Sequence, residues 1–451
     1  MRRVDPGAPL MLGTVLAHGV GGRQDLPIPF AYAVTGAALA LVISFLALGA
    51  LWREPRLADP GAGRPLPAGL AGLVDSAGCR WALRGLGLLL AAYFCLGLFL
   101  GPDDERNPTA GTLYILFWVG LVPLSLLFGP VWRLLNPLRT LHLLGCAVLR
   151  RDRDRGPLAL APGLGYWPAA VGLTAFVWLE LVAPDRATLP VIRAWLICYA
   201  VGTLVAATLF GARWFDRGDA FEAYSGLVGR LAPLGRRDDG TLVWRNPLEG
   251  MATLRAAPGL TATVVVLLGS TLFDSLVSTP GWARFTYRLD LSPTLVGTLG
   301  LGAVVGAVLA VYVGACALAA RLAGADRAGQ VAGRFAHSIV PIAVGYVLAH
   351  YYSLLVVDGQ RTLSLLSDPL VTGADWLGTR DWVANTALIT PASVATLQVT
   401  LIVLGHLLGT VLSHDRTLEV FPGRSALAAQ VPLLVLMVGY TVAGLLLLFA
   451  G

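Results

Sequence analysis

Acidic, imidazole and amide side chains interrupt long apolar stretches at four positions, Glu180, Asp274, His350 and Gln398. An ionisable group inside a hydrocarbon layer is costly, so each is expected to have a partner and to mark a functional position. At about 1.5 Å of rise per residue, the four side chains lie roughly 6 to 12 Å from the same ends of four different helices. They therefore share one layer.

Imidazole and carboxylate groups at one depth form a ligand set for Zn, Mn, Fe or Cu. The segment HGVGGRQDLP at 18–27 precedes the first apolar stretch on the same side, so His18 can join the layer. We expect His18, His350 and Asp274 to be metal ligands. Glu180 and Asp274 are the expected catalytic groups.

Two other interpretations of this layer stay open. In a structural one, Glu180 pairs with Arg193, Asp274 caps a hydroxyl such as that of Ser278, and His350 bonds to a tyrosine. In the other, the buried groups titrate, as in an ion- or proton-coupled transporter.

His337 and His406 form a second pair. They lie roughly 9 and 12 Å from the opposite ends of two neighbouring helices. Matched histidines could hold haem, a metal or a proton path, or could bond to backbone freed by Pro341. His337 and His350 lie roughly 20 Å apart along one helix, so they belong to different sites. A haem- or copper-binding redox protein is a further alternative.

Ten apolar segments are long enough to carry these side chains, since a helix needs about 20 residues to span the hydrocarbon layer. With 56% hydrophobic and 13% charged residues, the composition also indicates a membrane protein. Lipid-facing segments must satisfy their own backbone hydrogen bonds, which predicts an all-α polytopic transmembrane bundle. The segments are 28–52, 85–101, 111–131, 164–184, 189–211, 260–282, 294–319, 331–356, 391–413 and 427–450.

All 33 basic residues are arginines. If the chain from residue 18 starts outside the cell, 23 arginines fall in inner loops and eight in outer segments. This positive-inside distribution predicts that both ends of the mature chain are extracytoplasmic. It indicates a lipid bilayer as partner and no nucleic acid.

Residues 1–17 combine a basic start, a short apolar run and small residues at Val15 and Ala17. This pattern is typical of a signal peptide whose cleavage would leave His18 first, and the alternative is an interfacial tail. We divide the chain into an extracytoplasmic N-terminal segment, 1–27, and a single transmembrane domain, 28–451.

The longest inner loop, 212–257, places Asp216, Asp219 and Glu222 three residues apart. This spacing predicts a solvated face of an amphipathic helix along the cytoplasmic membrane surface, with a carboxylate site as the alternative. The sequence SHDR at 413–416 is interpreted as a charge cluster at a helix end.

Familiar catalytic motifs are missing from the sequence. It has no P-loop, GxSxG, HExxH or Rossmann fingerprint, and its five cysteines show no CxxC spacing. This argues against an ATP-driven pump, a serine hydrolase of familiar type and a thiolate metal site.

Six stretches together carry a family resemblance over nearly the whole chain. The chain resembles the fenitrothion hydrolase family of actinobacterial and proteobacterial membrane proteins. The stretches are AHGVGGRQDLPIP, FGPVWRLLNPL, GDAFEAYSGLVGRLAPLGRR, TLFDSLVSTPGW, RFAHSIVPIAVGYVLAHYYSLL and GHLLGTVLSHDR.

The resemblance implies a multi-pass protein of the bacterial plasma membrane that hydrolyses the aryl P–O bond of organophosphate triesters. Such hydrolysis needs a metal that polarises the phosphoryl oxygen, together with an apolar pocket. We expect Trp282, Tyr351 and Gln398 to form this pocket and a small apolar substrate to enter it from the lipid.

Overall fold

The computed structural model describes residues 23–57, 59, 61–324, 328–421 and 425–450. The expected leader, 1–17, and the expected ligand His18 lie outside these residues.

Nine helical stretches of the described chain are long and apolar enough to cross a membrane. The one remaining expected segment, 164–184, forms the shorter helix α8, Trp167–Leu181. The prediction of an all-α polytopic bundle is thereby confirmed. The nine are α1 (Phe30–Leu51), α3 (Ala77–Leu100), α4 to α5 (Thr109–Phe128), α9 (Leu189–Phe210), α13 (Leu260–Val277), α15 (Pro293–Leu322), α16 to α17 (Gln330–Leu365), α18 (Pro391–Val420) and α19 (Ala426–Leu448).

Two of these stretches are composite. The first joins α4 (Thr109–Gly111), the π-helix η2 (Thr112–Val119) and α5 (Leu121–Phe128). The second joins α16 (Ala328–Phe335), η5 (Ala336–Ile339) and α17 (Val340–Leu365). The described part of α19 begins at Ser425.

Short elements connect the long helices. They are η1 (Arg23–Asp25), α2 (Ala68–Asp75), α6 (Trp132–Leu135), α7 (Pro137–Val148), η3 (Ala212–Trp214), α10 (Phe215–Gly218), α11 (Ala220–Val228), η4 (Gly229–Leu231), α12 (Pro247–Ala252), α14 (Pro280–Tyr287) and η6 (Thr386–Leu388). A small antiparallel sheet in the order β1-β3-β2 (Arg64–Pro65, Leu242–Trp244, Leu234–Arg236) was not expected from the sequence.

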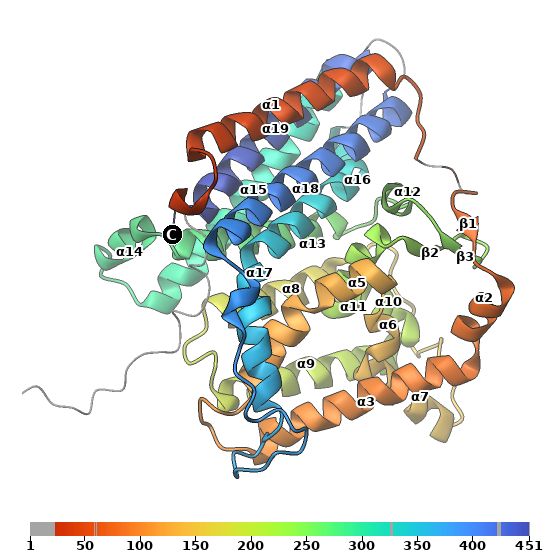
Figure 1. Ribbon diagram of the computed structural model, residues 1–451. Helices are drawn as coiled ribbons and strands as arrows, with labels where there is room; N and C mark the ends of the chain where they lie inside the picture. The colour runs from red at the N-terminus through yellow and green to blue at the C-terminus, as the bar shows by residue number, and fades with distance from the viewer. Residues whose placement is uncertain (1–22, 58, 60, 325–327, 422–424, 451) are drawn as a thin grey trace, which may run out of the picture.

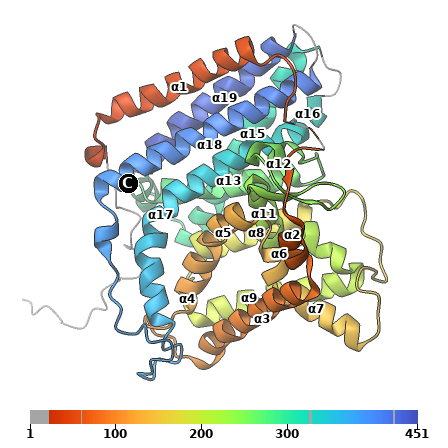
Figure 2. The same ribbon diagram turned by 45° about the vertical axis from the view of Figure 1, so that its right-hand side comes forward.

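The bundle has a buried centre and exposed margins. In both views α1, α18 and α19 lie side by side, and α3, α7 and α9 gather at the opposite edge (Figures 1 and 2). The most hydrophobic windows of α13 and of the α16 to α17 stretch are 78% and 72% buried, against 11% for α1. Side chains of α13 and α17 therefore face protein, whereas α1 faces mostly lipid.

Helices α17 and α18 pack closely through glycines. A Cβ on Gly345 would lie 2.5 Å from the Leu401 carbonyl oxygen, and one on Gly405 would lie 2.6 Å from that of Pro341. Small residues let membrane helices approach to this distance. The two helices run antiparallel, and α18 ends beside the linker that follows α1, which we call the linker end of the bundle.

Two similar stretches, WRLLNPL at 132–138 and WRNPL at 244–248, play the same structural role: each begins a helix. Asn136 accepts hydrogen bonds from two backbone N–H groups at the start of α7, and Asn246 forms a capping box with Glu249 in α12. The proline that follows each asparagine fits the first turn, where no backbone donor is needed.

The prediction of a solvated face in the loop 212–257 is wrong for α11. Asp219 and Glu222 are only 1% and 4% exposed, because α11 packs within the protein rather than along its surface. Asp216 is the more exposed of the three expected carboxylates.

Candidate functional site

A carboxylate and an imidazole meet between the two most buried helices. Nε2 of His350 lies 2.8 Å from Oδ2 of Asp274, and the Tyr351 hydroxyl donates to the same oxygen at 2.7 Å. Asp274 and His350 are 7% and 6% exposed. The expected partner for an intramembrane carboxylate is thus present.

A hydroxyl pair continues the network on the other side of the imidazole. Nδ1 of His350 lies 3.2 Å from Ser275 Oγ, which accepts a 2.9 Å hydrogen bond from Tyr346. An ionised Asp274 can only accept, so Nε2 carries the hydrogen and Nδ1 of a neutral His350 accepts from Ser275. Hydrogen bonds then run from Tyr346 through Ser275 and His350 to Asp274.

Helix periodicity explains why these groups converge. Tyr346 and His350 are four residues apart on α17, so they share the face that packs on α13. Asp274 and Ser275 are successive residues of α13. Sequence reasoning missed Ser275 and Tyr346, although both could have been found as neighbours of the singled-out pair at these spacings.

Glu180 lies near this network, and the ion pair with Arg193 that the structural interpretation gives it is absent from the structure. The Arg193 guanidinium donates to the Leu98 carbonyl oxygen instead. Glu180 is partly buried on α8 and lies close enough to Asp274 for their charges to interact. The expected layer therefore brings these two carboxylates together.

The expected cap of the Asp274 carboxylate is not observed. The Ser278 hydroxyl donates to the main-chain oxygen of Asp274, at 3.0 Å, and not to its carboxylate. Trp282 packs edge-on against Phe273, with ring centroids 5.6 Å apart. Gln398 is buried, and its Oε1 has no hydrogen-bond partner in the described chain.

Of the expected metal ligands, the structure describes His350 and Asp274, whereas His18 lies outside the described residues. Among the described residues, no three His, Cys, Asp or Glu side chains are grouped so that they could hold an ion. Each nitrogen of His350 already faces a protein partner, and Asp274 Oδ2 faces both His350 and Tyr351. His350 and Asp274 are therefore a side-chain pair in this structure.

No hydrogen bond joins His337 and His406 in the described chain. Glycine contacts place Ser338 against Gly409 and Pro341 against Gly405, so His406 lies nearly level with Pro341 on the facing helix. Each ring bonds to its own helix region, His337 Nδ1 to Arg334 O at 3.0 Å and His406 Nδ1 to Ile402 O at 2.8 Å.

Helix α18 carries buried polar side chains along its length. From Gln398 to Thr417 the helix rises roughly 28 Å, which is close to the thickness of a hydrocarbon core. The set, which we call the α18 polar line, is Gln398, His406, Thr410, Ser413, His414, Asp415 and Thr417. The surface charge cluster expected at SHDR is instead buried at His414 and Asp415.

A second charged cluster lies between α7, α10, α11 and the spanning helix α9. Nε and Nη2 of Arg139 donate to both carboxylate oxygens of Glu222 at 2.9 and 2.7 Å, and Nη2 also bonds to Asp216. Burial raises the pKa of Glu222 above its ordinary value, and the Arg139 guanidinium opposes this shift. The Tyr199 hydroxyl donates to Asp219, which caps α11. The cluster joins α7, α9 and α11, so we assign it a structural role.

An apolar groove of about 540 Å³ runs along α8. Thr174 is its only hydroxyl residue, and that hydroxyl donates to the Ala170 carbonyl oxygen of its own helix. The groove follows the helix that carries Glu180 two residues after Trp178. Its lining is Trp167, Ala170, Val171, Thr174, Ala175, Trp178, Trp195, Ala262 and Val266.

The fold and these contacts define a multi-pass membrane protein with a buried carboxylate and imidazole pair. No family model, no curated protein and no solved structure matches the chain.

Proposed function

We propose that this protein is a proton-coupled membrane carrier whose proton-binding group is the Asp274 and His350 pair. The observation that carries the proposal is the 2.8 Å contact between these two groups inside the bundle. A buried pair of this kind, held by side chains of two helices, can gain or lose a proton and thereby change how the helices pack.

The chemistry of one added proton supports this function. A proton that binds Nδ1 of His350 converts it from an acceptor to a donor toward Ser275. Ser275 must then turn its hydrogen to another acceptor. Tyr346, which now donates to Ser275, also lies 3.3 Å from the Gly444 carbonyl oxygen of α19. Protonation therefore alters contacts among α13, α17 and α19.

The α18 polar line supports a path for the proton. A row of buried polar groups across about one hydrocarbon thickness is costly in a purely structural helix. Two members, Gln398 and His406, each hold a buried atom with no partner in the described chain. These atoms are suited to bind water on a proton path.

The apolar groove on α8 indicates the class of cargo. Its tryptophans and aliphatic residues suit a neutral aromatic molecule dissolved in lipid. We further propose the orientation that the arginines predict, in a bacterial plasma membrane with both ends outside. Cysteine labelling of intact cells tests that orientation.

Difference infrared spectroscopy across a pH titration tests the proton-binding role without knowledge of the cargo. In lipid-reconstituted protein, a carboxyl or imidazole band should titrate in the wild type and disappear in both Asp274→Asn and His350→Gln. His142→Gln serves as the matched control, because this ring lies on α7 and faces the Arg153 carbonyl oxygen outside the network. Unchanged spectra in both variants of the pair would refute the proposal.

Hydrolysis of phosphotriesters is a second candidate, favoured by one observation. Ser275, His350 and Asp274 form a hydrogen-bonded sequence of hydroxyl, imidazole and carboxylate, as in nucleophilic hydrolases. A 4-nitrophenyl dialkyl phosphotriester provides the assay, since nitrophenolate release is visible. Release by the wild type that is lost in Ser275→Ala and kept in Ser278→Ala would favour the hydrolase. Protonophore-sensitive accumulation of intact ester would favour the carrier.

A further inference from the structure

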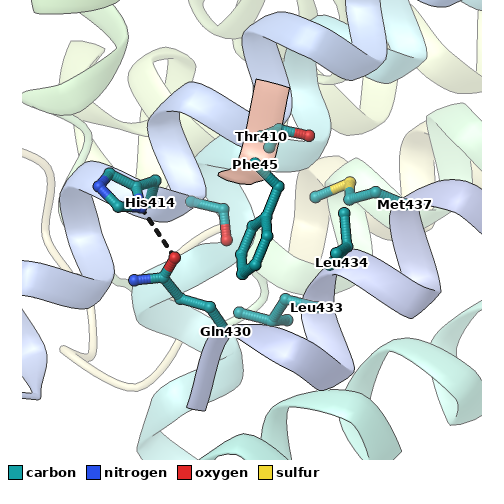
Figure 3. Close-up of a pocket in the computed structure, with 8 residues that line it drawn as sticks. Phe45, Thr410, His414, Gln430, Leu433, Leu434 and Met437 are labelled. Carbon is teal, nitrogen blue, oxygen red and sulfur yellow. Dashed lines mark hydrogen bonds between the residues drawn. The ribbon is translucent and has the colours of Figure 1, made fainter. Parts of the chain in front are cut away.

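A small cavity lies between α1, α18 and α19, near the linker end (Figure 3). Its volume is about 10 Å³, close to the least space that one water molecule needs. The polar part of the wall comes from α18 and α19, and the apolar part comes from α1 and α19. The lining residues are Phe45, Thr410, Ser413, His414, Gln430, Leu433, Leu434 and Met437.

His414 in this wall faces two oxygen atoms. Its Nε2 lies 2.8 Å from the Trp52 carbonyl oxygen. Its Nδ1 lies 2.8 Å from Oε1 of Gln430, the contact that Figure 3 marks with a dashed line. A carbonyl oxygen only accepts, so Nε2 carries a hydrogen. A neutral imidazole then has no hydrogen left on Nδ1 to donate to Gln430.

Only two arrangements satisfy both contacts. His414 is an imidazolium that donates to both oxygens, or the Gln430 amide is turned so that its NH₂ group donates to Nδ1. In the first arrangement, the Gln430 NH₂ group has no partner in the described chain, which is how the structure places it. In the second, the Gln430 amide oxygen takes the place of the NH₂ group and is the atom without a partner. Either way, one buried polar atom of Gln430 needs a partner at the cavity.

The charged groups around His414 are already engaged. Asp415 accepts hydrogen bonds from the backbone N–H groups of Arg56 and Leu57, at 2.6 and 3.4 Å. The Arg56 guanidinium stacks on Trp52, and Arg416 bonds to Ala252 O and to Glu419. The lining residues from α1 and α19 include no charged group, so His414 is the titratable residue of the cavity wall.

We propose that the cavity binds one water molecule, and that this water and His414 form the site where the α18 polar line exchanges protons with the linker side. The water fills the missing hydrogen bond of Gln430 and can bond to the Ser413 or Thr410 hydroxyl. A proton from solution bonds to Nδ1 of His414, and the Gln430 amide turns to present its oxygen. No other covalent bond changes. The role in proton exchange rests on the proposed proton-coupled function.

Water-edited solid-state NMR of the full chain in lipid bilayers, with ¹⁵N-labelled histidine, tests the site. The chain has six histidines, and His414→Gln assigns the relevant signal by its loss. We expect magnetisation transfer from water to the His414 ring and a reversible pH-dependent change from neutral ring to imidazolium. His337, buried against main-chain oxygen, is the internal control without such transfer.

Gln430→Leu should abolish the water transfer because it removes the amide and adds apolar bulk beside the cavity. If this variant does not fold, the wild-type spectra alone decide. A His414 ring without water transfer, or one that keeps a single protonation state through the titration, overturns the inference. The outcome is separable from that of the proposed function, because the infrared test follows Asp274 and His350 and this one follows His414.

Discussion

A double-mutant cycle on Asp274 and His350 measures the coupling energy of their contact, and thereby whether the contact involves a charged group. His350→Ala removes one partner of a buried carboxylate that also accepts a hydrogen bond from Tyr351 at 2.7 Å. A hydrogen bond to a charged group, here the ionised carboxylate, contributes about 1.5–3 kcal/mol. A neutral hydrogen bond between membrane helices contributes far less, about 0.6 kcal/mol on average and ~1.7 kcal/mol at most.

Since the 2.8 Å contact is enclosed and charge-assisted bonds are about twice as strong as neutral ones, we expect a coupling energy above about 2 kcal/mol. Equilibrium unfolding in mixed micelles of Asp274→Ala, His350→Ala and the double variant provides the value. The control cycle pairs Asp274→Ala with His406→Ala, which should add within about 0.5 kcal/mol. A coupling below about 1 kcal/mol for the first cycle would mean a neutral hydrogen bond. That result would refute the assignment of a charge-assisted hydrogen bond.

Three further predictions test the fold and the donor sets. Arg139→Met should lower the free energy of unfolding by about 3–5 kcal/mol because it leaves Glu222 buried without its partner. The exposed control, Arg133→Met, should cost under ~1 kcal/mol. Similar losses for both variants in denaturant titrations would contradict the burial of the Arg139–Glu222 pair. Gly345→Leu should destabilise by about 1–3 kcal/mol or more through its contact with α18, and Gly314→Leu, with open space around it, should not; the reverse order of melting temperatures would show that the helix pairing is wrong. Elemental analysis with a visible spectrum should show no stoichiometric transition metal and no Soret band, and either signal would reinstate a metal or haem site.

The helical architecture could be predicted from the sequence because its signal is local. Runs of about 20 apolar residues must form helices in lipid, so each of the ten segments contains a helix. The small sheet and buried α11 could not be predicted in this way. The sequence pattern around Glu222 predicts an exposed residue. Its burial depends on the pairing with Arg139, 83 residues earlier in the chain.

The candidate site was predicted in part. Asp274 and His350 stand out because charge inside an apolar segment is rare, and the structure brings them together at 2.8 Å. Their partners Ser275 and Tyr346 do not stand out, because single hydroxyls are common in membrane helices. The structural interpretation paired Glu180 with Arg193 across a short turn, yet that guanidinium bonds to Leu98 O on another helix. Helix rotation decides such pairings, and composition does not record it.

The cost of the α18 polar line argues against a structural explanation. Gln398 Oε1 and His406 Nε2 of this set, and Gln430 Nε2 of α19 beside it, are buried without a partner in the described chain. At about 1–3 kcal/mol for each unsatisfied group, their sum is a large part of the roughly 5–15 kcal/mol that stabilises a typical protein. Apolar side chains of similar volume would fill these positions at less cost. Gln398 Oε1 and His406 Nε2 on α18, with Gln430 Nε2 on the neighbouring α19, are therefore the atoms at which the proposed proton path would bind water.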